Sequence, residues 1–102
     1  MLAHNVFFTL KDSSPESQQK MVDACHKYLK GHTGTAFYAA GTLTPDLTRP
    51  VNDCDFHVAV HVISESSQAH DDYQISERHL QFREENKEGW EQVRMFDSDV
   101  SS

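Results

Sequence analysis

Apolar and polar residues alternate along residues 3–10 and again along residues 54–63, as they do in a β-strand with two unlike faces. In the first segment, one face holds His4, Val6, Phe8 and Leu10, with Ala3, Asn5, Phe7 and Thr9 opposite. In the second segment, one face holds Phe56, Val58, Val60 and Val62, with His57, Ala59, His61 and Ile63 opposite. Weaker patterns of this kind predict two further strands over residues 35–43 and 91–97.

The segment between the first two predicted strands has the repeat of an amphipathic helix. Ser14 is a favourable N-cap, and Pro15 suits the first helical position. Gly31, or Gly34 after a short loop, ends this helix. Over residues 15–30, one apolar stripe is formed by Met21, Val22, Ala24, Cys25, Tyr28 and Leu29.

A second helical region begins near Ser66 or Ser67 and is predicted in two pieces. Ser76 has the character of an internal N-cap, which would start a new helix at Glu77. Gly89 loosens the end of this helix. The residues that recur at helical spacing in the second piece are His79, Phe82, Arg83, Asn86 and Trp90.

These elements follow the order β-α-β-β-α-β, which is typical of an α+β, ferredoxin-like fold with helices on one face of a four-stranded antiparallel sheet. We expect one domain over residues 1–97, a mobile polar loop after residue 43 and a frayed tail over residues 98–102. The other face of such a sheet is bare. We assign the apolar face of residues 54–63 to it, and predict a homodimer packed sheet to sheet, because exposed apolar patches mark interfaces.

Composition and charge narrow the range of partners. The 102 residues include 16 acidic and 9 basic ones, for a formal net charge of −7. Such a surface repels phosphate backbones and anionic lipids, so neither nucleic acid nor membrane is an expected partner. No apolar run is long enough for a transmembrane helix, and the N-terminus lacks the features of a signal peptide. Cys25 and Cys54 fit no CxxC spacing, and two reduced thiols in a cytoplasmic protein are the expected state.

Several histidines lie on segments predicted to form the core, which indicates a polar pocket. His79 would enter near a helix N-terminus, where the partial positive charge lowers the pKa and leaves a neutral base. A break at Ser76 would turn Tyr73 towards His79, with Phe82 and Trp90 as the apolar floor. The wedge between helices and sheet would also be lined by His4, Val6, Phe8, His57, Ala59, Val93 and Met95. The histidines assigned to the surface are His26, His32, His61 and His70.

The same residues have purely structural interpretations. His4 and His57 could be half-buried histidines that hydrogen-bond each other or the backbone. Phe82 and Trp90 could be only core residues. No metal site is expected, because His57 and His61 are four residues apart on a strand, about 13 Å, which one ion cannot bridge. The chain has no GxGxxG, P-loop, GxSxG or HExxH motif, so no cofactor is predicted.

Three segments resemble the stress-responsive dimeric α/β-barrel (Dabb) family. They are the opening His-x-Val-Phe-Phe-x-Leu-Lys strand, the Asp-Phe-His-Val-Ala-Val-His-Val strand, and the Tyr-x5-His-x2-Phe segment that ends at Phe82. The resemblance spans residues 2–97 and implies a ferredoxin-like protomer whose sheets pair into a dimeric barrel.

The resemblance also implies roles for individual residues. In one plant member of the family, a polyketide cyclase, a histidine matching His79 resembles a general base, and a tyrosine matching Tyr73 assists it. Histidines matching His4 and His57 lie by the pocket, and Trp90 matches an apolar wall residue. Family members commonly have His-Pro-x-His before the phenylalanine, whereas this chain has Ser-Glu-Arg-His, which alters the turn that aims the last histidine.

Three functions are therefore open. The first is a small stress-response protein of the Dabb type that binds a small, partly apolar ligand. The second is a cofactor-independent lyase or cyclase, in which neutral His79 removes an acidic proton alpha to a carbonyl and Tyr73 donates a hydrogen bond to the enolate. The third is a structural dimeric module whose histidines have no chemical role.

Overall fold

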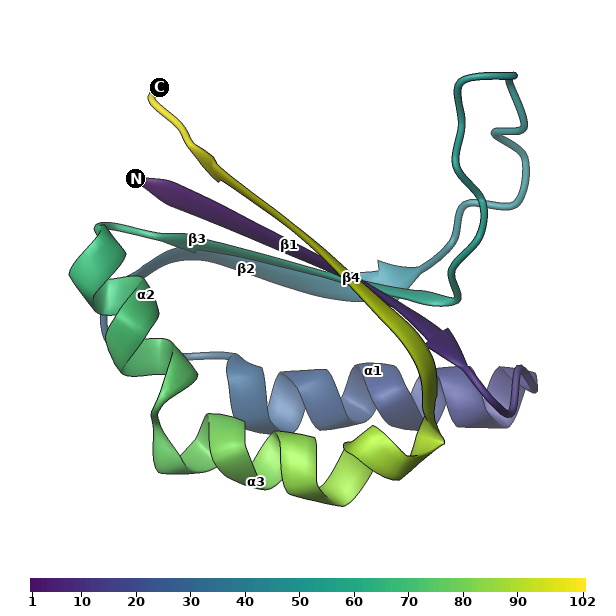
Figure 1. Cartoon of the computed structure of the whole chain (residues 1–102), viewed down its shortest axis with the longest axis horizontal. Coiled ribbons are helices and arrows are strands. Elements are labelled where there is room, and N and C mark those ends of the chain that lie inside the picture. Colours follow the sequence, from purple (N-terminus) through teal and green to yellow (C-terminus); the bar gives the residue numbers. More distant parts are fainter.

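One antiparallel sheet with strand order β2-β3-β1-β4 forms a layer of the molecule, and the helices form a second layer on one of its faces (Figure 1). The computed structural model describes residues 1–102. In chain order the elements are β1 (Leu2–Leu10), α1 (Pro15–Leu29), β2 (Thr35–Thr42), β3 (Val58–Ser64), α2 (Ser67–Gln74), α3 (Glu77–Asn86), the short 3-10 helix η1 (Lys87–Gly89) and β4 (Trp90–Asp99). This is the predicted ferredoxin-like βαββαβ fold.

Two predicted boundaries are wrong. The tail was predicted to begin at residue 98, but β4 continues to Asp99, which pairs with Leu2 of β1. Residues 100–102 follow this strand. Pairing with β1 gives the backbone of residues 98 and 99 hydrogen-bonding partners that their side chains do not reveal. β3 begins at Val58 rather than at residue 54, so the loop after β2 spans residues 43–57.

Serine side chains cap α1, α2 and α3 at their N-termini. The backbone N–H groups of Ser17, Ala69 and His79 donate to the hydroxyl oxygens of Ser14, Ser66 and Ser76 at 3.2, 3.1 and 3.2 Å. Each cap satisfies one of the N–H groups that have no partner inside the helix. The predicted division of the second helical region at Ser76 is confirmed, and it sets the direction of α3.

The two sides of β3 are the reverse of those predicted. In the antiparallel pairing of β1 with β3, directly opposed side chains project to the same side of the sheet. The opposed pairs are Val58 with Phe8, Val60 with Val6, and Val62 with His4. All three valines are at most 1% exposed. Alternation separates the two sides of a strand without showing which one the helices cover, so assigning this valine face to a dimer interface was wrong.

The opposite face of the sheet carries no helix and has its own aromatic side chains. The Phe7 ring lies 4.9 Å from that of Phe56 and 5.7 Å from that of Phe96. Phe37 and Phe96 are 56% and 54% exposed. The loop formed by residues 43–57 extends from the sheet on the side away from the helices (Figure 1). We call this uncovered surface, with Phe7, Phe37, Phe56 and Phe96, the open face.

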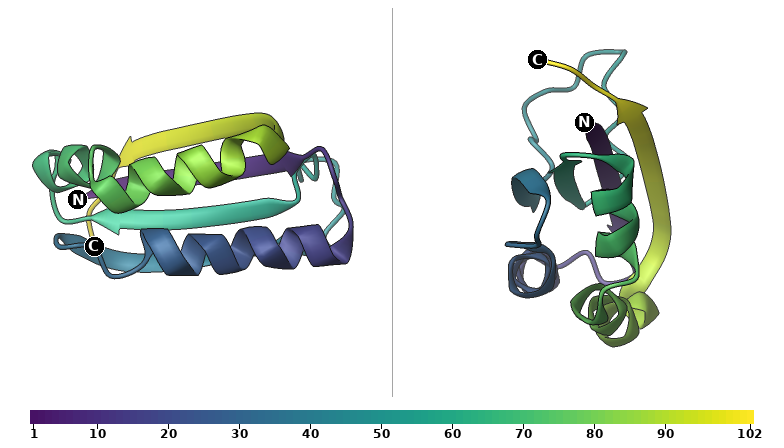
Figure 2. Two further views of the ribbon diagram at one scale, coloured as in Figure 1. Left: turned by 90° about the horizontal axis from the view of Figure 1, so that it is seen from below. Right: turned by 90° about the vertical axis from the view of Figure 1, so that its left-hand side faces the viewer.

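α1 and α3 lie side by side across the other face (Figure 2). Their inward side chains, among them Cys25 and Phe82, pack against the sheet. The Arg78 guanidinium joins the two helices by donating to the carbonyls of Lys27 and Lys30 at 2.7 and 2.8 Å. Burial raises the pKa of the Cys25 thiol to about 12, so the thiol stays protonated at neutral pH. Every helix is too short or too polar to cross a membrane.

Candidate functional site

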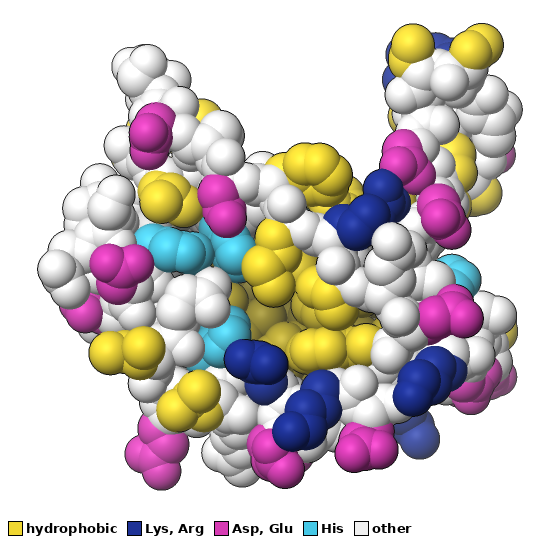
Figure 3. All heavy atoms as spheres, in the orientation of Figure 1, with side chains coloured by type: hydrophobic (Ala, Val, Ile, Leu, Met, Phe, Trp, Pro, Cys, Tyr) yellow, Lys and Arg dark blue, Asp and Glu magenta, His cyan; other side chains and the backbone are white.

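A pocket of about 310 Å³ lies between α3 and the covered face of the sheet. Figure 3 shows it as an apolar hollow, with histidines at one end and basic side chains along the edge formed by α3. Its volume lies at the lower end of the range for small-molecule sites. The lining residues are His4, Val6, Phe8, Leu29, Val60, Tyr73, Gln74, His79, Phe82, Arg83, Lys87, Trp90, Val93 and Met95.

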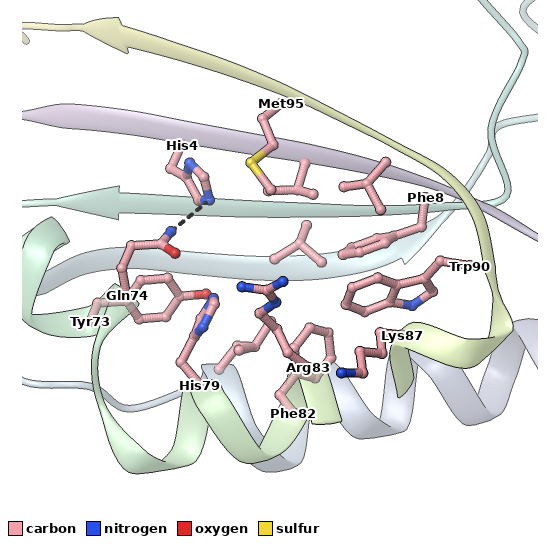
Figure 4. Close-up of a pocket in the computed structure, with 14 residues that line it drawn as sticks. His4, Phe8, Tyr73, Gln74, His79, Phe82, Arg83, Lys87, Trp90 and Met95 are labelled. Carbon is pink, nitrogen blue, oxygen red and sulfur yellow. Dashed lines mark hydrogen bonds between the residues drawn. The ribbon is translucent and has the colours of Figure 1, made fainter. Parts of the chain in front are cut away.

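Strand alternation builds the floor of the pocket. The sheet contributes His4, Val6, Phe8, Val60, Val93 and Met95. At one end this floor is aromatic, because the Phe8 ring lies 4.9 Å from that of Trp90, and Phe82 of α3 lies 5.7 Å from the same indole. At the other end it becomes polar, where His4 meets side chains from α2 and α3 (Figure 4).

Tyr73 and His79 face each other at the polar end, from opposite sides of the helix break at Ser76 (Figure 4). Their ring centroids are 4.9 Å apart, and the rings meet edge to face at 71°. An unbroken helix would point residues six positions apart in different directions, about 240° around its axis. The Ser76 cap is therefore the local feature that brings the two rings together.

Burial sets the electrostatic state of this pair. Burial, together with the smaller effect of the positive charge of Arg83, lowers the pKa of His79 to about 4. The direction is the one expected from sequence, but burial rather than the helix N-terminus is the main cause. The imidazole is therefore uncharged at neutral pH, and its Nδ1 is buried without a hydrogen-bond partner. Burial also raises the pKa of Tyr73, so its hydroxyl remains a hydrogen-bond donor.

His4 is held in a defined orientation beside this pair. Its Nδ1 lies 2.5 Å from Oδ1 of Asp97, and its Nε2 lies 3.3 Å from Nε2 of Gln74. A carboxylate only accepts, so Nδ1 carries the hydrogen and Nε2 accepts from the Gln74 amide. His4 is 3% exposed, so these contacts also satisfy both of its buried nitrogens.

Two more histidines lie at the polar end, although their sequence context assigned them to the surface. The His70 ring is 4.7 Å from that of His4, and the His32 ring is 4.9 Å from that of Tyr73. Helix periodicity could not show this, because the place of His70 depends on where α2 packs against the end of the sheet, and His32 lies in the loop after α1. Donor atoms of His4, His70 and Asp97 lie within 4.8 Å of one another, a set of two imidazoles and a carboxylate that could hold a metal ion.

Two residues predicted to line the pocket lie outside it. The Nδ1 of His57 accepts from the backbone N–H of Leu10 at 2.9 Å, so this side chain caps the end of β1. Ala59 is paired with Phe7, on the side of the sheet that faces away from α3. Both errors follow from the reversed sides of β3, and Val60 takes the position expected of Ala59.

The sequence analysis missed three polar residues of the pocket, Gln74, Arg83 and Lys87. Gln74 gave no signal, because its role depends on the end of α2 meeting His4. A signal did exist for Arg83 and Lys87, which follow His79 at intervals of four residues. Positions four apart lie on one side of a helix, so a pocket facing His79 also faces them.

Solved structures share this fold. A Dabb family protein from Mesorhizobium loti is 19% identical, with a TM-score of 0.79 over 99% of this chain and 97% of that chain. A dimeric ferredoxin-like protein of unknown function from Thermobifida fusca is 14% identical, with a TM-score of 0.79 over 97% and 90%. Hydroxynitrile lyase from Passiflora edulis is 20% identical, with a TM-score of 0.73 over 98% and 93%. At these identities the likeness establishes the fold alone.

No curated protein matches the sequence. The protein-family model described as the stress responsive A/B barrel domain, Dabb, matches residues 2–100, nearly the whole chain. This match agrees with the three segments that resemble the family and with the ferredoxin-like fold. The chain belongs to the Dabb family of stress responsive A/B barrel domains.

Proposed function

We propose that this protein binds a small, partly apolar molecule in the pocket between α3 and the sheet. The observation that carries the proposal is the two-part lining: 9 of the 14 residues are hydrophobic, and the polar groups gather mainly at one end and along α3. Small-molecule sites commonly combine an apolar wall with a few converging polar groups. The unpartnered Nδ1 of His79 supports the proposal, because a buried polar atom gains stability when a ligand supplies its partner.

Binding can be tested by thermal shift and titration calorimetry against a panel of aromatic and fatty-acyl compounds. We expect hits whose affinity falls at least about tenfold in Trp90→Ala, which removes the aromatic wall. Leu80→Ala is the matched control, because Leu80 lies on α3, is 54% exposed and does not line the pocket. A panel without hits, or affinities equal in the two variants, would exclude the pocket as the binding site.

A second candidate is a lyase or cyclase reaction that needs no cofactor. It is favoured by the pairing of an uncharged imidazole with a protonated phenol in a largely apolar site. His79 would take a proton from the carbon alpha to a carbonyl, while Tyr73 donates a hydrogen bond to the enolate oxygen. The enolate carbon would then attack a second carbonyl of the same molecule, and the new alkoxide would recover a proton. Hydroxynitrile lyase from Passiflora edulis has this fold, so the fold is compatible with lyase chemistry.

Turnover of β-keto and polyketide-like substrates tests this second function. We expect His79→Gln to lower kcat by roughly 10²–10⁴-fold, as loss of a general base does. Tyr73→Phe keeps the ring and removes the donor, so it should lower kcat with a smaller change in KM. Turnover that persists in His79→Gln would contradict the reaction and leave ligand binding as the function.

We also propose that the protein forms a homodimer through the open face. Exposed aromatic side chains support this proposal, because an apolar patch of this kind usually marks an interface. Structural neighbours from Thermobifida fusca and Bacteroides fragilis are described as dimeric. Light scattering over a range of protein concentrations should give twice the 11.6 kDa chain mass. A constant monomer mass would overturn the proposal.

A further inference from the structure

The charges around the pocket are opposite to those of the chain as a whole. The protein has 16 acidic and 9 basic residues. None of the residues that line the pocket is acidic, whereas Arg83 and Lys87 are basic. A cationic pocket in an acidic protein favours a ligand with negative charge, because the local field attracts what the remaining surface repels.

Arg83 is directed into this pocket. It lies one turn after His79 on α3, and its guanidinium extends from the helix towards the sheet (Figure 4). None of the three ion pairs in the structure involves Arg83. Arg83 is exposed, so the five N–H donors of its guanidinium face solvent, where a ligand in the pocket can reach them. The protein supplies no carboxylate for it, so a ligand can.

Lys87, the first residue of η1 directly after α3, places a second positive charge four residues after Arg83. Its ammonium pairs with Glu84 at 3.2 Å, but the side chains of Lys87 and Glu84 are 48% and 77% exposed. An exposed pair of this kind contributes little stability, so it does not prevent the ammonium from turning towards a ligand. Figure 3 shows the dark blue basic side chains along this edge of the hollow.

The remaining polar groups of the pocket do not offer a comparable charge. His4 and Gln74 hydrogen-bond each other, and His79 is uncharged at neutral pH. On the other side of Arg83 the lining is aromatic, with Phe8, Phe82 and Trp90. The pocket therefore combines a guanidinium that has no carboxylate partner with an apolar wall that suits a hydrocarbon chain or an aromatic ring.

We propose that the ligand is an amphipathic monocarboxylate, whose carboxylate contacts Arg83 and Lys87 and whose apolar body lies against Phe8 and Trp90. This inference rests on the proposed function, and it names the class of molecule that the same pocket binds. Arginine suits a carboxylate because its planar fork matches the two oxygens, and such charge-assisted hydrogen bonds are stronger than neutral ones.

Pairs of ligands that differ only in the carboxylate separate its contribution to the affinity from that of the apolar body. The full chain is titrated in a calorimeter with octanoate and 4-phenylbutyrate, and with the primary amide of each acid, which has nearly the same size and no charge. We expect each acid to bind at least about tenfold more tightly than its amide at low ionic strength. Raising the salt concentration should weaken the acids and leave the amides nearly unchanged.

Variants then locate the charge that is responsible. Arg83→Gln should abolish the preference of acid over amide, and Lys87→Gln should reduce it by a smaller factor. Arg83→Lys keeps the charge without the fork, so it should retain part of the preference. Lys20→Gln on α1 removes one positive charge away from the pocket lining and should change nothing.

The outcomes distinguish this inference from the proposed function. Equal affinities of acids and amides for the unmodified protein would overturn the carboxylate assignment while leaving the pocket as a binding site. An acid preference that survives in Arg83→Gln would also overturn it, because the charge would then lie elsewhere. Absence of binding by all four compounds would count against both the inference and the proposed function.

Discussion

The two faces of the sheet both carry apolar side chains, yet they have opposite surroundings. On the covered face, Val58, Val60 and Val62 are at most 1% exposed and pack against the helices. On the open face, Phe37 and Phe96 remain more than half exposed. Apolar character therefore does not distinguish the core of the protomer from a surface that a partner could cover. What distinguishes them is the position of α1 and α3.

The largest test of this difference is Val60→Asp on the covered face. A charge placed there has neither water nor a partner, so we expect a loss of about 4 kcal/mol or more in the free energy of unfolding. Urea denaturation followed by circular dichroism measures it. A variant that keeps the stability of the unmodified protein would contradict the assignment of this face to the core.

A second test concerns His79, on the covered side of the sheet. His79→Gln should alter how the free energy of unfolding depends on pH. The pKa of His79 is about 4 in the folded chain and about 6.5 in the unfolded chain, so the unfolded chain binds more protons between these values. The free energy of unfolding therefore falls as pH drops from 6.5 towards 4, by about 2–3 kcal/mol from this group.

Urea denaturation at intervals from pH 7 to pH 4.5 measures this effect as the difference between His79→Gln and the unmodified protein. The variant should lose less stability over this range. His61→Gln, on the open face, is the matched control. If His61→Gln also loses less stability over this pH range, by the same amount as His79→Gln, burial of His79 in the pocket is not the cause.

Phe96→Asp tests the open face. Because Phe96 is already 54% exposed, the protomer should keep its secondary structure, but the proposed dimer should dissociate more readily. We expect the dissociation constant to rise at least about thirtyfold, as loss of a central aromatic side chain commonly causes. Light scattering during size exclusion measures it. Leu80→Asp adds the same charge on the helix side, and equal dissociation by both variants would place the interface elsewhere.

The smallest expected effect comes from the caps that position the helices. Ser76→Ala removes the hydroxyl that accepts from His79 N–H and should cost about 1 kcal/mol of stability. It should also weaken ligand binding, because this cap aims α3 and hence His79. Ser14→Ala removes the equivalent cap from α1, away from the pocket, and should cost similar stability without changing binding. If both variants bind the ligand equally well, the Ser76 cap does not contribute to the geometry of the binding site.

Local sequence signals were sufficient for the elements and for much of the pocket. The serine caps, the alternation of β1 and the break at Ser76 are local, and each is present in the structure. The break brings Tyr73 to His79, and the fold expected from the order of the elements adds His4 from β1. Local signals could not predict which side of β3 the helices cover, because either side could pack against an apolar layer. His57 and Ala59 were misplaced as a result.

The sequence by itself determined the order of the strands and helices, because alternation, helical repeat and capping depend on residues a few positions apart. It also determined that a histidine and a tyrosine flank a helix break. Only the tertiary structure decided which face of β3 is buried, that Asp97 and Gln74 orient His4, and that Arg83 enters a pocket without acidic residues. The contacts of His4 with Gln74 and Asp97 join residues 70 and 93 positions apart along the chain, and no local pattern encodes which of the possible partners will meet.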